Sequence, residues 1–440
     1  MAWLQPLFPP LARAASRVYY RLTCAGARVP TQGPVLLVAN HPNSLLDPVL
    51  VQAVAGRPIR FLAKAPLFTD RRVGWLVRGA GAIPVYRASD DPTQMERNTD
   101  MFRAVHAALA AGHAVGIFPE GLSHSDPRLA PLRTGAARIA LGVGRVFPVI
   151  PVGLVFRAKD LFRSEALALV GDPVAWDDIA ARGPSDLVAA RELTARIDAA
   201  LRRVTVNLER WEDRPLAECT VRIWEAERGA DRLPDERVAR LEVATRVLAA
   251  VRSSGDAVAL ALAGEVRTHC ARLTRLGLRP GDLRADVGLG RGVSWGARRL
   301  PLILPLAAAT AVAGFALFLV PYWLTGRIAA RIRAPTDQVA TSKLLVGIPL
   351  YVAWVGALAA LAAARFAVWA GLFVLLAAPA IGMAGLRIRE RWRGDWRDAR
   401  RFFFLRSRRH LAAQLAERQR QLADRLHRLY ETYAAQGALT

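Results

Sequence analysis

The sequence predicts an α/β domain around a mostly buried sheet, then a helical connector and a C-terminal helical region embedded in a membrane. Two observations carry this prediction. Up to about residue 172, short β-branched or apolar runs alternate with alanine-rich helical stretches, as in α/β folds. Three long charge-free runs then lie between residues 300 and 386, and each is long enough to cross about 30 Å of hydrocarbon as a helix.

Residues 1–25 are expected to form an amphipathic helix at a membrane surface. A helix over residues 11–22 places Arg13, Arg17 and Arg21 on one stripe and apolar side chains elsewhere, which suits a lipid surface. A solvated helix that packs on the following domain explains the same pattern equally well.

Residues 26–183 are expected to form the α/β domain. Apolar runs predict strands at 35–39, 83–86, 114–118 and 149–156, and alanine-rich stretches predict helices at 101–111 and 135–142. Residues 184–299 show a helical pattern of mixed charge and no strong motif. We interpret them as a helical connector.

The membrane region consists of charge-free runs at 300–326, 344–364 and 366–386, and only Arg365 separates the last two. Arginines flank the outer ends of these runs, and cytoplasmic borders of membrane helices are rich in Arg and Lys. We therefore predict that 344–386 is a transmembrane hairpin and that 387–440 is a basic cytoplasmic tail. The segment 300–326 has basic flanks on both sides, which favours a re-entrant or interfacial element; three true spans are the alternative.

The formal net charge is +24, and 53% of the residues are apolar. This apolar content excludes a disordered tail protein, and the charge indicates an anionic partner. Residues 325–440 carry 19 basic and 7 acidic residues, so half of the excess borders the apolar runs. This distribution favours a phospholipid membrane and argues against nucleic acid. Three cysteines without a CxxC spacing support neither a disulfide framework nor a metal site.

The chemistry is expected at the end of the strand at 35–39. His41 follows this strand, and the carboxylate of Asp47 comes six residues later. A histidine whose second nitrogen is held by a carboxylate is a ready general base, although a histidine at a turn is also a common polar residue. Asn43 or Ser44 could cap the short helix that carries Asp47.

Three further blocks follow in order. Gly81 opens a turn that leads through a strand to Arg87, and the sequence Phe-Pro-Glu-Gly ends at Gly121. A later apolar strand contains Pro151. Arginine suits bidentate phosphate contact, and glycine lets a ligand approach the backbone. Each block alone is too common to indicate a function.

Together and in this order, the four blocks resemble those of the glycerophospholipid acyltransferase family, which carries an NHxxxxD box, a GxIxxxR box, an FPEG box and an apolar strand with proline. The resemblance covers about residues 15–175. It implies a mixed sheet flanked by helices. It also implies transfer of a fatty acyl group from acyl-CoA or acyl carrier protein to a hydroxyl of a glycerol-phosphate acceptor in phospholipid synthesis, with no cofactor. The expected location is the cell membrane, with the catalytic domain on its cytoplasmic face.

The resemblance also implies roles for particular residues. His41 corresponds to the base that removes the hydroxyl proton, and Asp47 to its orienting partner. The positions that correspond to substrate-binding residues of the family are Arg87, Gly81, Glu120, Gly121, Lys64, Arg133 and Pro151.

One departure concerns spacing, because five residues instead of four separate His41 from Asp47. On an ideal helix, the extra residue would rotate Asp47 by about 100°, so we expect the turn at Pro42 and Asn43 to absorb it. The longer box resembles that of fungal-type glycerol-3-phosphate and dihydroxyacetone-phosphate acyltransferases. The acceptor therefore stays open among lysophosphatidate, glycerol 3-phosphate, another lysophospholipid and dihydroxyacetone phosphate. A non-catalytic membrane lipid-binding scaffold is the remaining alternative.

A second departure follows the FPEG box. The chain has Leu122, Ser123 and His124 where many relatives have Thr-Arg-Ser. A basic residue near the acceptor is thereby lost, and Arg128 or Arg133 is expected to substitute for it.

Overall fold

The structure is a computed structural model that describes residues 2–71, 73–87, 96, 98–229, 233–285 and 303–435. The end of the predicted connector (286–299), the start of the first apolar run (300–302) and the last five residues of the tail lie outside these ranges.

The chain divides into two compact units. The α/β unit comprises Met1–Glu209, Leu233–Glu242 and Ala334–Thr341. The helical unit comprises Arg210–Arg232, Val243–Arg333 and Ser342–Thr440.

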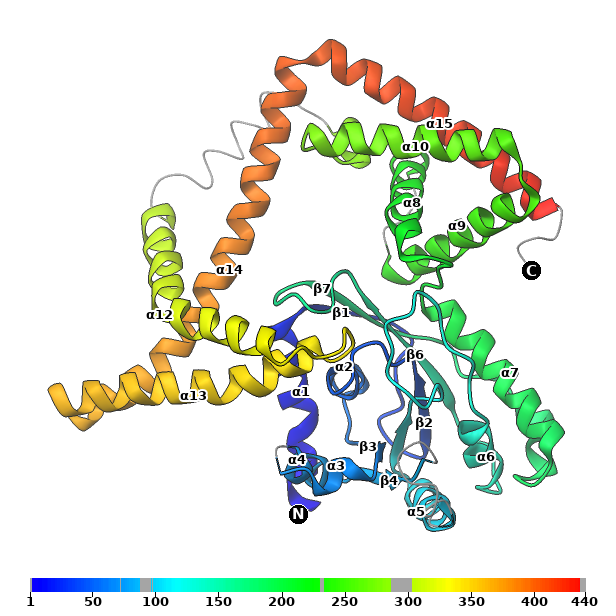
Figure 1. Cartoon of the computed structure of the whole chain (residues 1–440), viewed down its shortest axis with the longest axis vertical. Helices are drawn as coiled ribbons and strands as arrows, with labels where there is room; N and C mark the ends of the chain where they lie inside the picture. Colours follow the sequence, from blue (N-terminus) through cyan, green and yellow to red (C-terminus); the bar gives the residue numbers. More distant parts are fainter. Residues whose placement is uncertain are drawn as a thin grey trace. The chain divides into compact units, whose positions relative to one another are not determined.

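A mixed sheet forms the centre of the α/β unit (Figure 1). It has seven strands in the order β1-β7-β6-β2-β5-β3-β4. The five strands from β6 to β4 are parallel, whereas β7 pairs with β6 in the antiparallel direction and β1 is parallel to β7. The strands are β1 (Arg21–Gly26), β2 (Val35–Ala39), β3 (Ile59–Lys64), β4 (Ile83–Val85), β5 (Ala114–Ile117), β6 (Val149–Phe156) and β7 (Glu165–Val170). All five residues of β2 are buried, as expected of a central strand covered on both faces.

Helices cover both faces of this sheet. Leu36 and Val38 of β2 share one core with α5 (Asn98–Ala110), α6 (Gly135–Leu141) and α7 (Leu187–Val204). The helices α1 (Phe8–Tyr19) and α2 (Leu46–Ala55) pack on each other, and α2 also contacts β3, β6 and β7. Alternate side chains of a strand point to opposite faces, so β2 contributes to both layers.

The remaining elements of the α/β unit are short. They are the 3-10 helices η1 (Ala2–Leu7) and η3 (Asp177–Arg182), and the helices α3 (Pro66–Thr69) and α4 (Gly74–Gly79).

The structure differs from the sequence expectation at both ends of this unit. The amphipathic helix was expected to continue to residue 22, but α1 ends at Tyr19 and β1 begins at Arg21. The side chains of Tyr19 and Tyr20 are buried, and Tyr20 begins the exit from the helix with an extended backbone. The connector was expected from residue 184, whereas α7 completes the α/β core.

The helical unit contains α8 (Arg214–Arg228), α10 (Ala257–Arg275) and α15 (Arg409–Ala435), with most of α9 (Pro234–Ser254). The short 3-10 helices η4 (Trp211–Asp213) and η5 (Pro280–Arg284) also belong to it. Buried apolar side chains from α8, α10 and α15 form a common core. A disulfide joins Cys219 of α8 to Cys270 of α10, which the absence of a cysteine motif did not predict, because packing of two helices brings together residues that are 51 positions apart.

Among the described residues, three helices are long and apolar enough to cross a membrane. They are α12 (Ile303–Arg331), α13 (Val339–Arg365) and α14 (Val368–Ser407). Large apolar side chains on them are exposed, among them Val352, Phe373 and Leu376. Exposed apolar surface on helices of this length is suited to lipid. The chain is therefore a membrane protein, and the side on which each helix end lies stays a prediction.

Small residues bring α12 and α14 close together. A Cβ atom added to Gly314 would lie 2.9 Å from the carbonyl oxygen of Ile381, and one added to Gly385 would lie 3.1 Å from that of Thr310. Membrane helices associate through such small residues, because glycine allows two backbones to approach. Each of the three long apolar helices continues past an internal proline, which is Pro321 in α12, Pro349 in α13 and Pro379 in α14.

Candidate active site

The parallel part of the sheet collects polar side chains at one edge. His41 follows β2, Arg87 follows β4, and Glu120 and Gly121 follow β5, while Lys64 is the last residue of β3. Since these strands are parallel, their carboxyl ends meet at the same edge. Ligands of open α/β sheets bind at this edge.

His41 and Asp47 form the pair that the sequence predicted. The Nδ1 atom of His41 lies 2.8 Å from Oδ2 of Asp47. The side chain of Asp47 is fully buried, whereas that of His41 keeps 19% of its surface exposed. Burial raises the pKa of Asp47, and the hydrogen bond from His41 opposes this shift. The carboxylate of Asp47 holds Nδ1 of His41, and Nε2 is left as the nitrogen that can exchange a proton.

The turn before α2 accommodates the extra residue of the box. The backbone N–H of Asn43 donates to Oδ2 of Asp47 at 2.6 Å, and Ser44 adopts a left-handed conformation with φ of 48°. Helix α2 begins only at Leu46. The expected helix cap by Asn43 or Ser44 is wrong, because the residue that precedes α2 is Leu45 and no side chain caps the helix.

The imidazole ring of His41 lies on a stack of aromatic rings. Its centroid is 4.0 Å from that of Phe118, with an angle of 12° between the planes. Phe118 in turn stacks on Phe61 of β3. This stack fixes the orientation of the imidazole ring, and with it the direction of Nε2.

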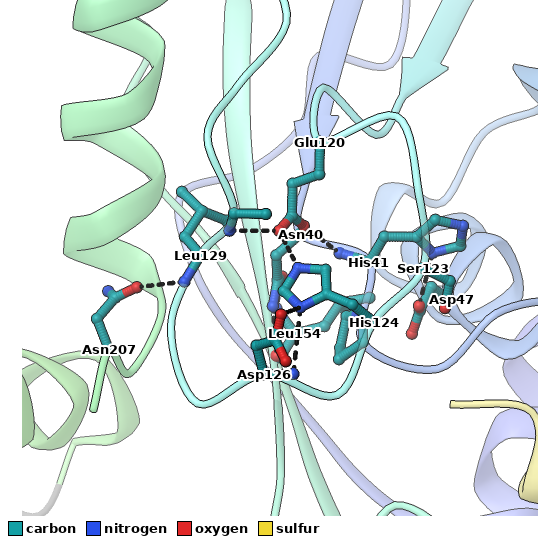
Figure 2. Close-up of polar contacts among 12 residues, drawn as sticks. Asn40, His41, Asp47, Glu120, Ser123, His124, Asp126, Leu129, Leu154 and Asn207 are labelled. Atoms are coloured by element: carbon teal, nitrogen blue, oxygen red, sulfur yellow. Dashed lines mark hydrogen bonds and ion pairs between the residues drawn. The ribbon is translucent and has the colours of Figure 1, made fainter. Parts of the chain in front are cut away.

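The backbone at His41 is held from both neighbouring strands. The side chain of Asn40 donates to the carbonyl of Leu154 in β6 at 3.0 Å and accepts from its N–H at 2.7 Å. On the other side, the N–H of His41 donates to Oε1 of Glu120 at 2.8 Å. Figure 2 shows these contacts around the histidine.

Both carboxylate oxygens of Glu120 make hydrogen bonds within the fold. Its carboxylate is buried, and Oε2 accepts from the N–H of Ala130 at 2.8 Å and pairs with Nε2 of His124 (Figure 2). The oxygens of Glu120 thus bind His41, Ala130 and His124, and the substrate contact that the family resemblance implies stays a prediction. The hydrogen bond to Glu120 raises the pKa of His124.

Two arginines approach Gly121. Arg87 donates through Nη1 to the carbonyl of Gly121 at 2.8 Å. Gly121 has a φ of +74°, and a Cβ atom there would lie 2.7 Å from Nε of Arg133. Only glycine combines this conformation with such a close approach. The arrangement brings two guanidinium groups to one backbone position, which suits an anionic ligand.

Other predicted residues lie elsewhere. Gly81 precedes β4 and packs near Gln5 and Arg60, at the opposite edge of the sheet. Pro151 lies inside β6, opposite Val38 of β2. Lys64 is exposed at the carboxyl edge, where no described contact ties it to His41.

The motifs missed several residues around the site. The side chain of Asn43 donates to the hydroxyl of Tyr20 at 2.7 Å, and Oγ of Ser123 accepts from the N–H of Ser44 at 3.1 Å. Lys159 donates to the carbonyl of Pro42 at 2.6 Å. Lys159 lies in the loop after β6, and no local pattern points to it. In the part of the chain that the structure describes, no group of three His, Cys, Asp or Glu side chains could hold a metal ion.

Comparisons with known proteins agree with this geometry. The family described as Acyltransferase matches residues 21–155. Glycerol-3-phosphate O-acyltransferase 2 of Saccharomyces cerevisiae is 40% identical over 85 residues, which cover 18% of this chain and 11% of that protein. The chloroplastic 1-acyl-sn-glycerol-3-phosphate acyltransferase BAT2 of Brassica napus is 31% identical over 126 residues, which cover 29% and 34%.

A bacterial protein is similar over a longer stretch. The 1-acyl-sn-glycerol-3-phosphate acyltransferase of Streptococcus pneumoniae is 26% identical over 190 residues, which cover 42% of this chain and 66% of that protein. The chain thus spans less than two thirds of the length of each of these three relatives.

Proposed function

We propose that the chain is a membrane-bound O-acyltransferase of the glycerophospholipid acyltransferase family, because residues 21–155 match the family described as Acyltransferase and the chain is similar to acyltransferases named for glycerol phosphates. It moves a fatty acyl group from the thioester of acyl-CoA or acyl carrier protein to a hydroxyl of a glycerol-phosphate acceptor. Lysophosphatidate and glycerol 3-phosphate are the acceptors that we propose, since relatives named for each are similar to this chain.

The hydrogen-bonded pair of His41 and Asp47 is the observation that supports this proposal most directly. Oδ2 of Asp47 accepts a hydrogen bond from the N–H at Nδ1, so Nε2 of His41 takes the proton from the acceptor hydroxyl as the hydroxyl oxygen attacks the thioester carbonyl. The C–O bond forms and the C–S bond breaks. The imidazolium then returns the proton to the leaving sulfur. No covalent acyl-enzyme is needed, because the hydroxyl is itself the nucleophile.

Arg87 and Arg133 are proposed to hold the phosphate of the acceptor. Their convergence at Gly121 supports this role, since guanidinium groups bind phosphate oxygens in pairs. The apolar helices α12 to α14 support the membrane-bound part of this proposal, since they are long and apolar enough to cross a membrane. We propose that the catalytic site works at the cytoplasmic face of the cell membrane, without a metal or another cofactor.

The test uses the full chain in membranes and a panel of acceptors. Labelled acyl-CoA and labelled acyl carrier protein are each offered with glycerol 3-phosphate, lysophosphatidate, dihydroxyacetone phosphate and other lysophospholipids. We expect acyl transfer to a glycerol phosphate, and we expect the His41→Ala variant to lose about 10²- to 10⁴-fold in rate. A folded wild-type protein that consumes neither donor with any acceptor refutes the proposal and favours a lipid-binding scaffold. Full activity of His41→Ala refutes the assigned base.

A further inference from the structure

The Pro42–Asn43 turn that separates His41 from Asp47 is held at successive residues by other parts of the fold. Lys159 donates from Nζ to the carbonyl of Pro42 at 2.6 Å. The hydroxyl of Tyr20 accepts from the side chain of Asn43 and donates to the backbone carbonyl of Lys159. Lys159 thus holds the turn through its side chain directly and through its backbone carbonyl by way of Tyr20.

Lys159 is also the cation beside the buried carboxylate of the pair. It is half-buried, and burial lowers its pKa while the charge of Asp47 opposes that shift. Burial raises the pKa of Asp47, and the charge of Lys159 is one of the smaller influences that oppose this shift. The charged groups that act on Lys159 come from four segments and are Asp47 of α2, Asp126 after β5, Asp160 of its own loop and Asp337 before α13.

A hydrogen-bonded chain continues from Lys159 to the connection between α12 and α13. Nζ of Lys159 donates to Oγ of Ser125 at 2.6 Å, and Oγ1 of Thr336 donates to the same oxygen at 2.7 Å. Ala334–Thr341 belongs to the α/β unit. Within this stretch Ala340 is fully buried and Asp337 is 8% exposed, so the stretch packs onto the unit instead of passing over it.

We propose that Lys159 is a positioning residue for the His41–Asp47 pair, and that the α12–α13 connection holds Lys159 in place through Ser125. Lys159 fixes the turn that absorbs the fifth intervening residue and places a positive charge near Asp47. The expected effect of Lys159 on catalysis rests on the proposed function, because this effect is measured as a rate of acyl transfer.

The main test compares three variants of the full chain in nanodiscs. Lys159→Met removes the charge and the hydrogen bonds at similar length, and Lys159→Arg keeps the charge. Arg157→Met is the matched control, because it removes an exposed charge from the same loop. For Lys159→Met we expect kcat to fall about 10- to 100-fold, the scale of losing one charged hydrogen bond, with the KM values for acceptor and donor within about twofold of wild type.

The pH profile separates positioning from a merely structural role. Without Lys159 the Asp47 carboxylate is easier to protonate, and the two groups of the pair titrate together. The acidic limb of kcat/KM should therefore move to higher pH in Lys159→Met and return toward wild type in Lys159→Arg. The proposal is overturned if Lys159→Met stays within about threefold of Arg157→Met in kcat, or lowers kcat without moving the limb.

A second measurement does not depend on any activity. The titration of His41 is followed by NMR of the full chain with ¹⁵N-labelled histidine, and the His41→Gln variant identifies its signal. We expect the midpoint of His41 to shift in Lys159→Met and not in Arg157→Met. An unchanged midpoint overturns the proposal even if no acceptor is ever acylated, whereas a shifted midpoint without acyl transfer refutes only the proposed function.

The link to the membrane segments is tested with a double-mutant cycle. Thr336→Val removes the hydrogen bond to Ser125 and conserves the shape of the side chain. We expect it to lower kcat about two- to fivefold in the wild-type background and to cause no further loss in Lys159→Met, because residues that act through one contact are not additive. Equal losses in both backgrounds would show that Thr336 does not act through Lys159.

Discussion

Substitutions of Asp47 should lower kcat by different amounts, depending on whether the new side chain can accept the hydrogen bonds that Oδ2 accepts in the wild type. One oxygen, Oδ2, accepts from both His41 Nδ1 and the N–H of Asn43. The other oxygen, Oδ1, is buried, and no partner for it lies in the described part of the chain. In the Asp47→Asn variant, the amide oxygen can take the place of Oδ2 and keep both hydrogen bonds. The variant then loses the negative charge but keeps the tautomer of His41.

The magnitude follows from this geometry. A charged hydrogen bond is worth about 1.5–3 kcal/mol and a neutral one about 0.5–1.5 kcal/mol, so Asp47→Asn should lower kcat about 10- to 100-fold. Asp47→Ala leaves His41 and Asn43 without this acceptor and should lose about 10²- to 10⁴-fold, as His41→Ala does. The double variant of His41 and Asp47 should be no worse than His41→Ala alone, because the two residues act as one unit.

The assay is steady-state acyl transfer with labelled donor, together with thermal unfolding to show that each variant folds. Since burial raises the pKa of Asp47, the wild type loses stability as pH rises through the pKa of the folded state, and Asp47→Asn does not. The difference between the unfolding midpoint of Asp47→Asn and that of the wild type should therefore shift in favour of Asp47→Asn as the pH rises above the ordinary pKa of an aspartate side chain. If Asp47→Ala stays within about threefold of wild type, the orienting role is refuted. If Asp47→Asn is as inactive as His41→Ala, the shared use of Oδ2 is refuted.

Three further outcomes are expected. Arg87→Ala should lower kcat/KM about 10- to 150-fold with phosphorylated acceptors, on the scale of one or two charged hydrogen bonds, and much less with an acceptor that lacks phosphate; equal losses would contradict a phosphate contact. Asn40→Ala removes both hydrogen bonds to Leu154 and should lower the free energy of unfolding by about 2 kcal/mol along with kcat, so an unchanged unfolding curve would exclude a role in holding His41. Because the hydrogen bond to Glu120 raises the pKa of His124, this pair stabilises the fold most below the usual pKa of histidine and less as pH rises through the folded value. The unfolding midpoint of His124→Gln should therefore lie further below that of wild type at pH 6 than at pH 8.5, and a gap that grows with pH would contradict this reasoning.

Local sequence pattern was sufficient for much of the fold. The strands at residues 35–39 and 149–156 have the predicted bounds, because buried parallel strands are continuous apolar runs. His41, Arg87 and Glu120 each follow a strand. They lie at one edge of the sheet because these strands are parallel. The strands β1, β3 and β7 were not predicted. β1 carries several exposed residues and shows no apolar run.

The roles within the site were harder to predict from motifs. The motif did not indicate that the oxygens of Glu120 bind His41, Ala130 and His124, and the expected contact of Glu120 with substrate stays a prediction. Gly81 belongs to the same motif as Arg87, yet the strand between them places it at the other edge of the sheet. A short motif fixes which residues occur together, whereas the direction of the strand decides which of them meet.

The sequence by itself determined that an α/β domain with a His–Asp box precedes apolar helices, because periodicity, composition and motif spacing are properties of neighbouring residues. Only the tertiary structure decided what holds that box. Lys159 lies 117 positions from Pro42, and Thr336 lies 211 positions from Ser125. They reach the site because β2 lies between β5 and β6 in the sheet and because the α12–α13 connection packs onto the α/β unit. Contacts at such separations depend on strand order and packing, which no local pattern encodes.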